Sequence, residues 1–274
     1  MSCTRSSAWL ARLFVIALAC GAGLPAAAGA ESDLYRASAV VSGQGEENRA
    51  IGLAQCLEDV LVKVSGDPRL MTDRNVAELK RRAGEFVDRF AYRDRMSGVP
   101  IHDEQGSYDR PHDLSAEFDV AKIDEILRSL GRQPWLSPRP RVVVFLAVFG
   151  RKADFALASD GDADMRTSLA AAAARVGLPM ALPTSAQLEQ RELNASTLSR
   201  ADVPKRETLA TTEDVALAGT LQWSDEALGW VASWRMRSDA TDYRWQIRGV
   251  GFDDSFRNGM RGAAQVLSGH GKPQ

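Results

Sequence analysis

Residues 215–223 read VALAGTLQW, residues 229–237 read GWVASWRMR and residues 243–249 read YRWQIRG. Each run alternates apolar side chains with polar or small ones, which is the period of a strand with one buried face. Short loops rich in Asp, Ser, Gly and Ala separate the runs, so the chain reverses direction twice. The three runs predict an antiparallel meander, and residues 255–267 predict a helix that covers its buried side.

The residues that precede the meander complete a second half of the chain. Residues 141–149, RVVVFLAVF, are a nearly uninterrupted β-branched and aromatic run, which is typical of a strand covered on both faces. Residues 163–176 are rich in alanine and predict a helix that ends at Gly177. Residues 183–212 are polar and mixed, and predict one or two short helices. We expect an edge strand, a helix, the meander and a closing helix.

The first half of the chain has the pattern of a separate unit. Residues 35–41 alternate as a strand, residues 86–94 and 114–120 predict two more, and residues 74–84 and 121–130 predict helices. Between the first strand and these elements lies a helix with a single apolar stripe, made of Leu53, Leu57, Val60, Leu61 and Val64. The sequence Gly66-Asp67-Pro68 predicts the end of that helix.

A proline-rich segment separates the two halves. Pro134, Pro138 and Pro140 favour an extended connector, which places a boundary near residue 137. The expected fold class is therefore α+β, with two small domains at residues 31–137 and 138–274. Each domain is expected to be a mainly antiparallel sheet packed by helices.

Residues 1–30 have the pattern of a secretory signal peptide. Arg5 and Arg12 precede a short apolar run at residues 13–20, and Ala28 and Ala30 satisfy the Ala-x-Ala rule for cleavage after residue 30. The apolar run is too short to cross a hydrocarbon layer of about 30 Å. We therefore expect a periplasmic protein whose mature chain has no transmembrane span. Lipid attachment at Cys20 is the alternative.

Charge and cysteine content exclude several classes of protein. The chain has 34 basic and 36 acidic side chains, so its net charge of −2 argues against a nucleic-acid-binding surface. Cleavage after residue 30 would remove Cys3 and Cys20, and Cys56 alone cannot form an internal disulfide. Its helical spacing predicts a buried thiol. The sequence has no phosphate loop, dinucleotide fingerprint or nucleophile elbow, and it predicts no cofactor.

Two segments carry a resemblance to a known family. The sequence LVKVSGD at residues 61–67, and Trp135 with Arg139-Pro140 before the hydrophobic strand, resemble the bacterial domain of unknown function 2066 family. The resemblance extends over most of the mature chain. It implies an exported protein of the bacterial envelope, and it carries no established activity or catalytic residue.

A loop between two predicted strands contains candidate metal ligands. His102, Asp103, His112 and Asp113 lie within it, and imidazole and carboxylate groups together can hold zinc or calcium. Their offsets are irregular, however, and a solvated hairpin loop would have the same composition. The metal site and the solvated loop are both kept as hypotheses.

The outer face of the meander is the candidate binding surface. Arg235, Arg237, Arg244 and Arg248 occupy alternate strand positions, so their guanidinium groups would point the same way and recognise phosphate, carboxylate or an acidic partner. Trp230, a neighbouring position of the meander, is included in this candidate binding surface. The alternative is a solvated basic face balanced by neighbouring aspartates. We expect at least two of the four tryptophans of the meander to lie in the core instead.

These patterns favour a non-catalytic role. We expect a periplasmic binding or scaffolding component that presents a sheet face or edge to another envelope protein, with no role for nucleic acid. The alternative is a periplasmic metal-assisted hydrolase that uses the loop at residues 102–113. The sequence leaves the oligomeric state open.

Overall fold

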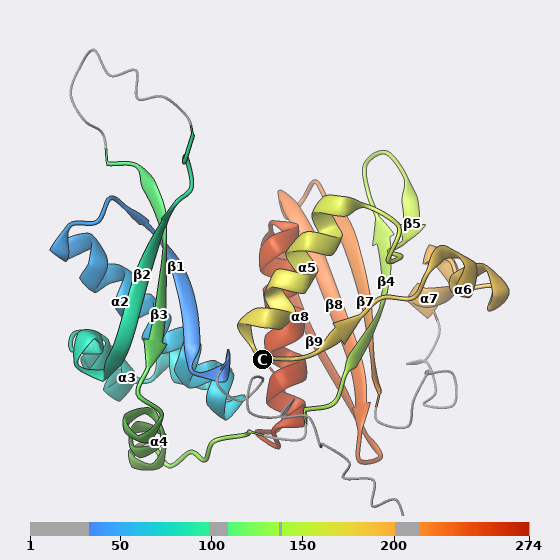
Figure 1. The fold of residues 1–274 in the computed structure, drawn as a ribbon. Coiled ribbons are helices and arrows are strands. Elements are labelled where there is room, and N and C mark those ends of the chain that lie inside the picture. Colours follow the sequence, from blue (N-terminus) through green and yellow to red (C-terminus); the bar gives the residue numbers. More distant parts are fainter. Residues whose placement is uncertain (1–32, 99–108, 137–138, 201–213, 274) are drawn as a thin grey trace, which may run out of the picture.

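The computed structural model describes residues 33–98, 109–136, 139–200 and 214–273. The expected signal peptide, Cys20, His102 and Asp103 lie outside the described residues. The described chain forms two sheets, one of three strands and one of six, each with helices packed on it. This confirms the α+β fold class (Figure 1). The division into domains near residue 137 stays a prediction.

The three-stranded sheet is antiparallel, with its strands in the order β1-β3-β2. The elements follow the order expected from the sequence: β1 (Arg36–Ser42), α2 (Glu46–Ser65), a 3-10 turn (Pro68–Thr72), α3 (Arg74–Lys80), a second 3-10 turn (Ala83–Phe86), β2 (Val87–Asp94), β3 (Pro111–Phe118) and α4 (Val120–Ser129). The stripe of α2 packs on one face of this sheet. Leu57, Val60 and Leu61 of the stripe are fully buried in one cluster with Leu114 of β3.

The six-stranded sheet contains the predicted meander. Its elements are β4 (Val142–Phe149), β5 (Asp154–Ala156), α5 (Ala163–Arg175), β6 (Met180–Ala181), α6 (Ser185–Gln190), α7 (Ala195–Arg200), β7 (Val215–Ser224), β8 (Gly229–Ser238), β9 (Thr241–Val250) and α8 (Phe252–Leu267). Strands β7, β8 and β9 pair antiparallel, as predicted. The expectation that β4 is an edge strand was wrong. It pairs parallel with β7 and also pairs with the short strands β5 and β6.

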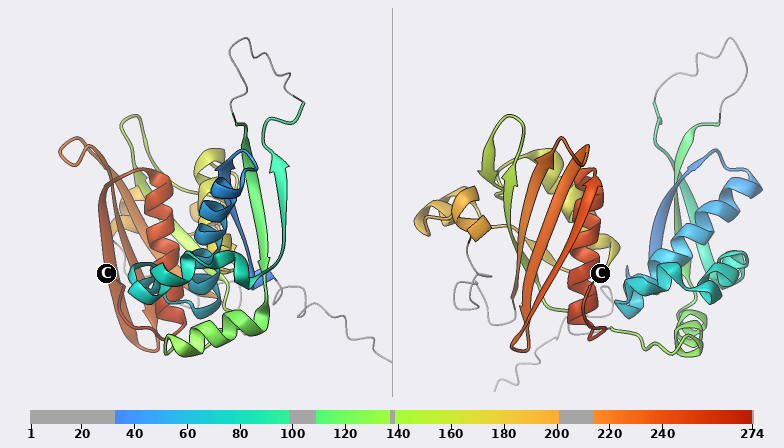
Figure 2. Two further views of the ribbon diagram at one scale, coloured as in Figure 1. Left: turned by 90° about the vertical axis from the view of Figure 1, so that its left-hand side faces the viewer. Right: turned by 180° about the vertical axis from the view of Figure 1, so that it is seen from behind.

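Strand β4 is buried on both faces, as its continuous apolar run predicts. Val144, Leu146 and Val148 lie in one cluster with residues of α5 and α8, whereas Phe145 and Ala147 lie in another with residues of α6 and α7. Helices α5 and α8 lie on the side of the six-stranded sheet that is turned toward the three-stranded sheet (Figures 1 and 2). Within the described residues no helix combines the length and the apolarity that a membrane crossing requires.

Two tryptophans of the meander are core residues, as expected. Trp234 is 1% exposed and Trp245 is 6% exposed, and both pack under α8. The close approach requires glycine on the helix. A Cβ atom at Gly259 would lie 2.5 Å from Trp234 Cε2, and one at Gly262 would lie 2.5 Å from Trp245 Nε1. These two glycines therefore set the distance between helix and sheet.

The junction between the two sheets is held by hydrogen bonds at the end of α2. The main-chain N–H of Trp135 donates to Val64 of α2 at 2.7 Å, and the Arg139 guanidinium lies 4.2 Å from the centre of the Trp135 ring. Ser268, just after α8, donates its hydroxyl to the oxygen of Gly66 at 3.1 Å. Gly66 has φ +74°, a left-handed conformation that ends α2 where the sequence predicted its end. The end of α2 is therefore held against the C-terminal half of the chain.

Candidate functional site

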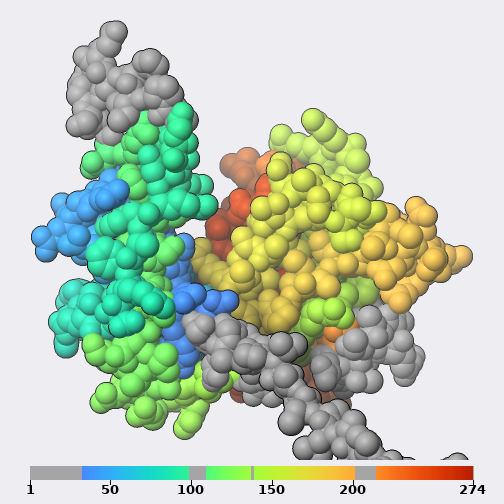
Figure 3. Space-filling view, in the orientation of Figure 1, coloured from blue at the N-terminus to red at the C-terminus, as the bar shows by residue number. Residues whose placement is uncertain are grey.

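A groove of about 960 Å³ follows the edge of β1 between the two sheets. Its walls come from β1, from one side of α2 and from α5 together with the turn that follows it. Its lining includes Asp33, Arg36, Ser38, Val40, Asp59, Lys63, Ala171, Ala174 and Arg175. The space-filling view shows the corresponding hollow between the N-terminal half and α5 (Figure 3).

Strand β1 turns hydrogen-bonding groups of its backbone toward this groove. Phe118 donates its N–H to Tyr35, and Gly43 donates its N–H to Arg110, so the odd-numbered residues of β1 bond to β3. The N–H and C=O groups of Arg36, Ser38 and Val40 therefore point to the other side. In the part of the chain that the structure describes, no strand pairs with β1 on that side.

Part of the opposite wall of the groove is made of small side chains. Ala171 and Ala174 of α5 line it, next to Arg175 at the end of the helix. An added strand lies about 4.8 Å from its neighbour in the direction of the hydrogen bonds. The short alanine side chains take up little of the space that such a strand needs.

The end of the groove next to the start of β1 is charged. Asp59 Oδ2 accepts hydrogen bonds from Arg175 Nε at 2.9 Å and Nη2 at 2.7 Å. Lys63 is 9% exposed, and its Nζ donates to the main-chain oxygens of Arg36 at 2.6 Å and Asp33 at 3.3 Å. Burial lowers the pKa of the Lys63 ammonium, although the negative charge of Asp59 opposes this. Lys63 is therefore a buried cation in the groove, beside the start of β1.

The predicted arginine surface lies elsewhere, on the other face of the six-stranded sheet from α5 and α8. Arg244 and Arg248 are exposed there, and Arg237 forms an ion pair with Asp242 at 2.7 Å. Arg235 donates to the oxygen of Leu198 at 2.8 Å and so ties α7 to β8. The four arginines share a face, as the alternation predicts. Two of them, Arg235 and Arg237, bond to other residues of the protein.

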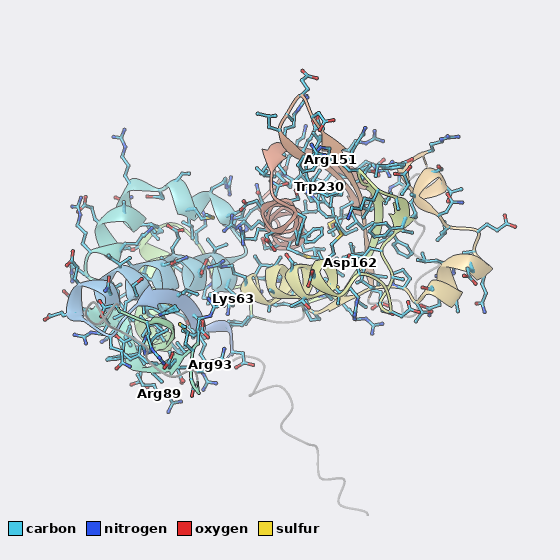
Figure 4. The ribbon with its side chains drawn as sticks, turned by 90° about the horizontal axis from the view of Figure 1, so that it is seen from above. Lys63, Arg89, Arg93, Arg151, Asp162 and Trp230 are labelled. Carbon is cyan, nitrogen blue, oxygen red and sulfur yellow. The ribbon has the colours of Figure 1, made fainter. Side chains whose placement is uncertain are left out.

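Trp230 does not join that surface. Its position in β8 places it on the face of Trp234, opposite the arginines. Its ring packs edge-on against Trp223, with ring centres 5.5 Å apart, and Arg151 lies 4.4 Å from the Trp223 ring centre. Figure 4 shows Trp230 beside Arg151. The structure therefore separates Trp230 from the residues with which the sequence grouped it.

The described members of the predicted metal site also point apart. His112 is buried on the α2 side of β3, where Nδ1 donates to the oxygen of Arg110 at 2.8 Å and Nε2 faces Gln44 at 3.1 Å. Asp113 lies on the opposite face and pairs with Arg93 at 2.6 Å. Adjacent strand residues cannot ligate one ion together. Because His102 and Asp103 lie outside the described residues, the metal site stays a prediction.

One feature of the sequence indicates a special environment in the groove and was not among the predicted site residues. Lys63 interrupts the apolar run at residues 60–64, so a lysine lies where a helix is otherwise buried. Such a lysine needs a specific environment for its charge. The free edge of β1 had no comparable signal, because the neighbours of a strand depend on the topology of the sheet.

Comparison with known proteins gives one match. A family model described as a domain of unknown function, DUF8605, matches residues 28–136. The expected resemblance to the domain of unknown function 2066 family was therefore wrong, because a different family model matches the segment that carries LVKVSGD and Trp135. No curated protein and no solved structure matches the chain.

Proposed function

We propose that this protein is an exported, non-catalytic binding protein that receives an extended segment of a partner protein along β1. The observation that carries this proposal is the edge of β1, whose backbone groups at Arg36, Ser38 and Val40 face a groove. Addition of a strand to a sheet edge is a common mode of peptide recognition, in which main-chain hydrogen bonds supply much of the affinity.

The environment of the edge supports a specific partner rather than unspecific pairing. Exposed edges are normally protected by charges, bulges or covering elements. Here α5 stands across the groove, so an incoming chain has to fit between β1 and Ala171 and Ala174. The groove therefore limits which extended segments can pair with β1.

The proposed location is the periplasm, with an envelope protein as the partner. The pattern of residues 1–30 supports export, because a positive start, a short apolar run and Ala28-x-Ala30 are the parts of a cleaved signal. Mass spectrometry of the mature amino terminus tests this. A first residue at Glu31 supports cleavage, an acylated Cys20 supports the lipoprotein alternative, and an intact precursor contradicts both.

Selection of peptides tests the binding function. Random dodecapeptides displayed on phage are selected on the purified mature chain, and the enriched sequences are synthesised with a fluorescent label. In Val40→Pro, the N–H that faces the groove is lost while the bonds from β1 to β3 remain. We expect this variant to weaken binding, measured by fluorescence anisotropy, at least about tenfold.

The matched control is Phe90→Pro on β2, at the opposite edge of the same sheet. This variant should bind the peptides as the unmodified protein does. Thermal unfolding of both variants checks that the sheet is retained. Failure to enrich any sequence, or equal binding by Val40→Pro and the unmodified protein, would contradict the proposed function.

A further inference from the structure

We propose that Lys63 is the receptor for a carboxyl terminus, so that the groove takes the last residues of its partner. This inference rests on the proposed function, because it specifies which part of a polypeptide enters the groove. Figure 4 shows Lys63 at the place where α2 approaches α5, at one end of the groove.

Lys63 has unused hydrogen-bonding capacity. An ammonium group has three donors. Two of them are used by the main-chain oxygens of Asp33 and Arg36. Neither acceptor carries a charge, and among the described residues no carboxylate oxygen forms an ion pair with Nζ, since the nearby Asp59 bonds to Arg175. One donor is available to a ligand, and the charges of Asp59 and Asp33 act on Nζ without a direct ion pair.

The surrounding charges favour an anion at this point. Arg139 lies near Lys63, and Arg175 and the half-buried Arg261 of α8 lie near Asp59, so the cations here outnumber the carboxylates of Asp59 and Asp33. Burying a charge without an opposite partner costs free energy. A ligand carboxylate would supply that partner, which gives this end of the groove a preference for negative charge.

The position of Nζ selects a terminal carboxylate over a side-chain carboxylate. Nζ bonds the main-chain oxygen of Arg36, so it lies within hydrogen-bond distance of the backbone of β1 at the edge of the sheet. A strand added along this edge would bring its main chain, rather than the tip of a side chain, next to that bond. The terminal carboxylate is the main-chain group with negative charge.

The same position fixes the direction of the bound chain. Lys63 lies beside Arg36 at the start of β1, and β1 runs away from it toward Ser42. A peptide that ends at Lys63 therefore runs antiparallel to β1. Because Lys63 already bonds the oxygen of Arg36, the final residues pair with Ser38, and earlier residues reach Val40.

The test uses random octapeptides displayed with free carboxyl termini and selected on the purified mature chain. Each enriched peptide is synthesised as the free acid and as the carboxyl-terminal amide, and both are titrated by fluorescence anisotropy. We expect amidation to weaken binding at least about tenfold, because it removes the charge that meets Lys63. This comparison uses only unmodified protein, so it does not depend on how a variant folds.

The variant Lys63→Met should weaken binding of the acid by a similar factor and bind acid and amide equally. Lys152→Met removes an exposed lysine and should leave the tenfold discrimination unchanged. Equal binding of acid and amide by the unmodified protein would overturn this inference while leaving the proposed function intact, provided that Val40→Pro still weakens both. Failure to select any peptide in either library would overturn both proposals.

Discussion

The guanidinium of Arg139 donates a hydrogen bond of 2.7 Å to the main-chain oxygen of Lys63, which lies 76 residues earlier in the chain. The same side chain donates to the oxygens of Val176 at 2.9 Å and Gly177 at 3.3 Å, just after α5. Burial lowers the pKa of Arg139 to about 10. One half-buried cation therefore connects the end of α2 with the end of α5, and these two helices line the groove together with β1.

Replacing Arg139 with methionine should destabilise the protein by about 2–4 kcal/mol, because several carbonyl oxygens would lose their shared donor and a ring contact would be lost. Urea denaturation of both proteins measures the change in the free energy of unfolding. The control is Arg81→Met, which removes an exposed arginine that pairs with Glu78 within one helix turn, and should cost less than about 0.5 kcal/mol. Equal effects of the two substitutions would contradict the linking role of Arg139.

Asp67 is a buried charge just after the end of α2, and its titration should be visible in the stability of the protein. The carboxylate is 0% exposed and bonds to Arg69 at 2.8 Å and Arg132 at 2.6 Å. Burial alone would raise the pKa of Asp67, but the hydrogen bonds from Arg69 and Arg132 outweigh it and lower the pKa from 3.8 to about 2.

Because the pKa is lowered on folding, the carboxylate stabilises the folded state above pH 4 and loses this contribution as the pH falls toward 2. We expect Asp67→Asn to be less stable than the unmodified protein by about 2–3 kcal/mol at pH 7. The difference should shrink by about 1–2 kcal/mol between pH 5 and pH 2, as measured by denaturant unfolding at each pH. A difference that does not change with pH would show that the charge of Asp67 is not responsible.

Cys56 should report on unfolding rather than on reactivity. Its thiol is fully buried in α2, and burial raises the pKa of the thiol to about 12. The thiolate is the reactive form, so alkylation at pH 8 should require opening of the N-terminal core. Iodoacetamide labelling of Cys56, followed by peptide mass mapping across a urea series, should follow the unfolding curve of the protein. Complete labelling without denaturant would contradict this.

The fold followed from the sequence where local patterns suffice. The alternation in residues 215–250 specified three paired strands and their buried side, and the stripe from Leu53 to Val64 specified one helix face. The parallel pairing of β4 with β7 was missed, because these strands are separated by α5, α6 and α7 and no local pattern encodes their pairing.

The groove could not be predicted in the same way, since it is formed by residues from distant parts of the chain. Lys63 and Arg175 line the same groove although they lie far apart in the chain, and the signal at Lys63 does not show which residues it will face. The segments around Lys63 and Arg139 were singled out only for a resemblance to the domain of unknown function 2066 family, which was wrong. In the structure they meet through the hydrogen bond from Arg139 to Lys63, at the junction between the two sheets.

A last prediction concerns the fit between α8 and the meander. In an exposed helix, replacing glycine with alanine stabilises by about 1 kcal/mol because the unfolded chain loses freedom. At Gly262 the sign should reverse, because the added Cβ would lie 2.5 Å from Trp245 Nε1 and would force the helix or the ring to move, at a cost of about 1–3 kcal/mol. Thermal unfolding of Gly262→Ala measures this. Gly251→Ala is the control, since a Cβ there meets nothing within 4 Å. The double variant Gly262→Ala/Trp245→Phe should recover part of the lost stability, because the smaller phenylalanine ring leaves room for the Cβ. An increase in stability of Gly262→Ala would mean that the contact between α8 and Trp245 is looser than the structure indicates.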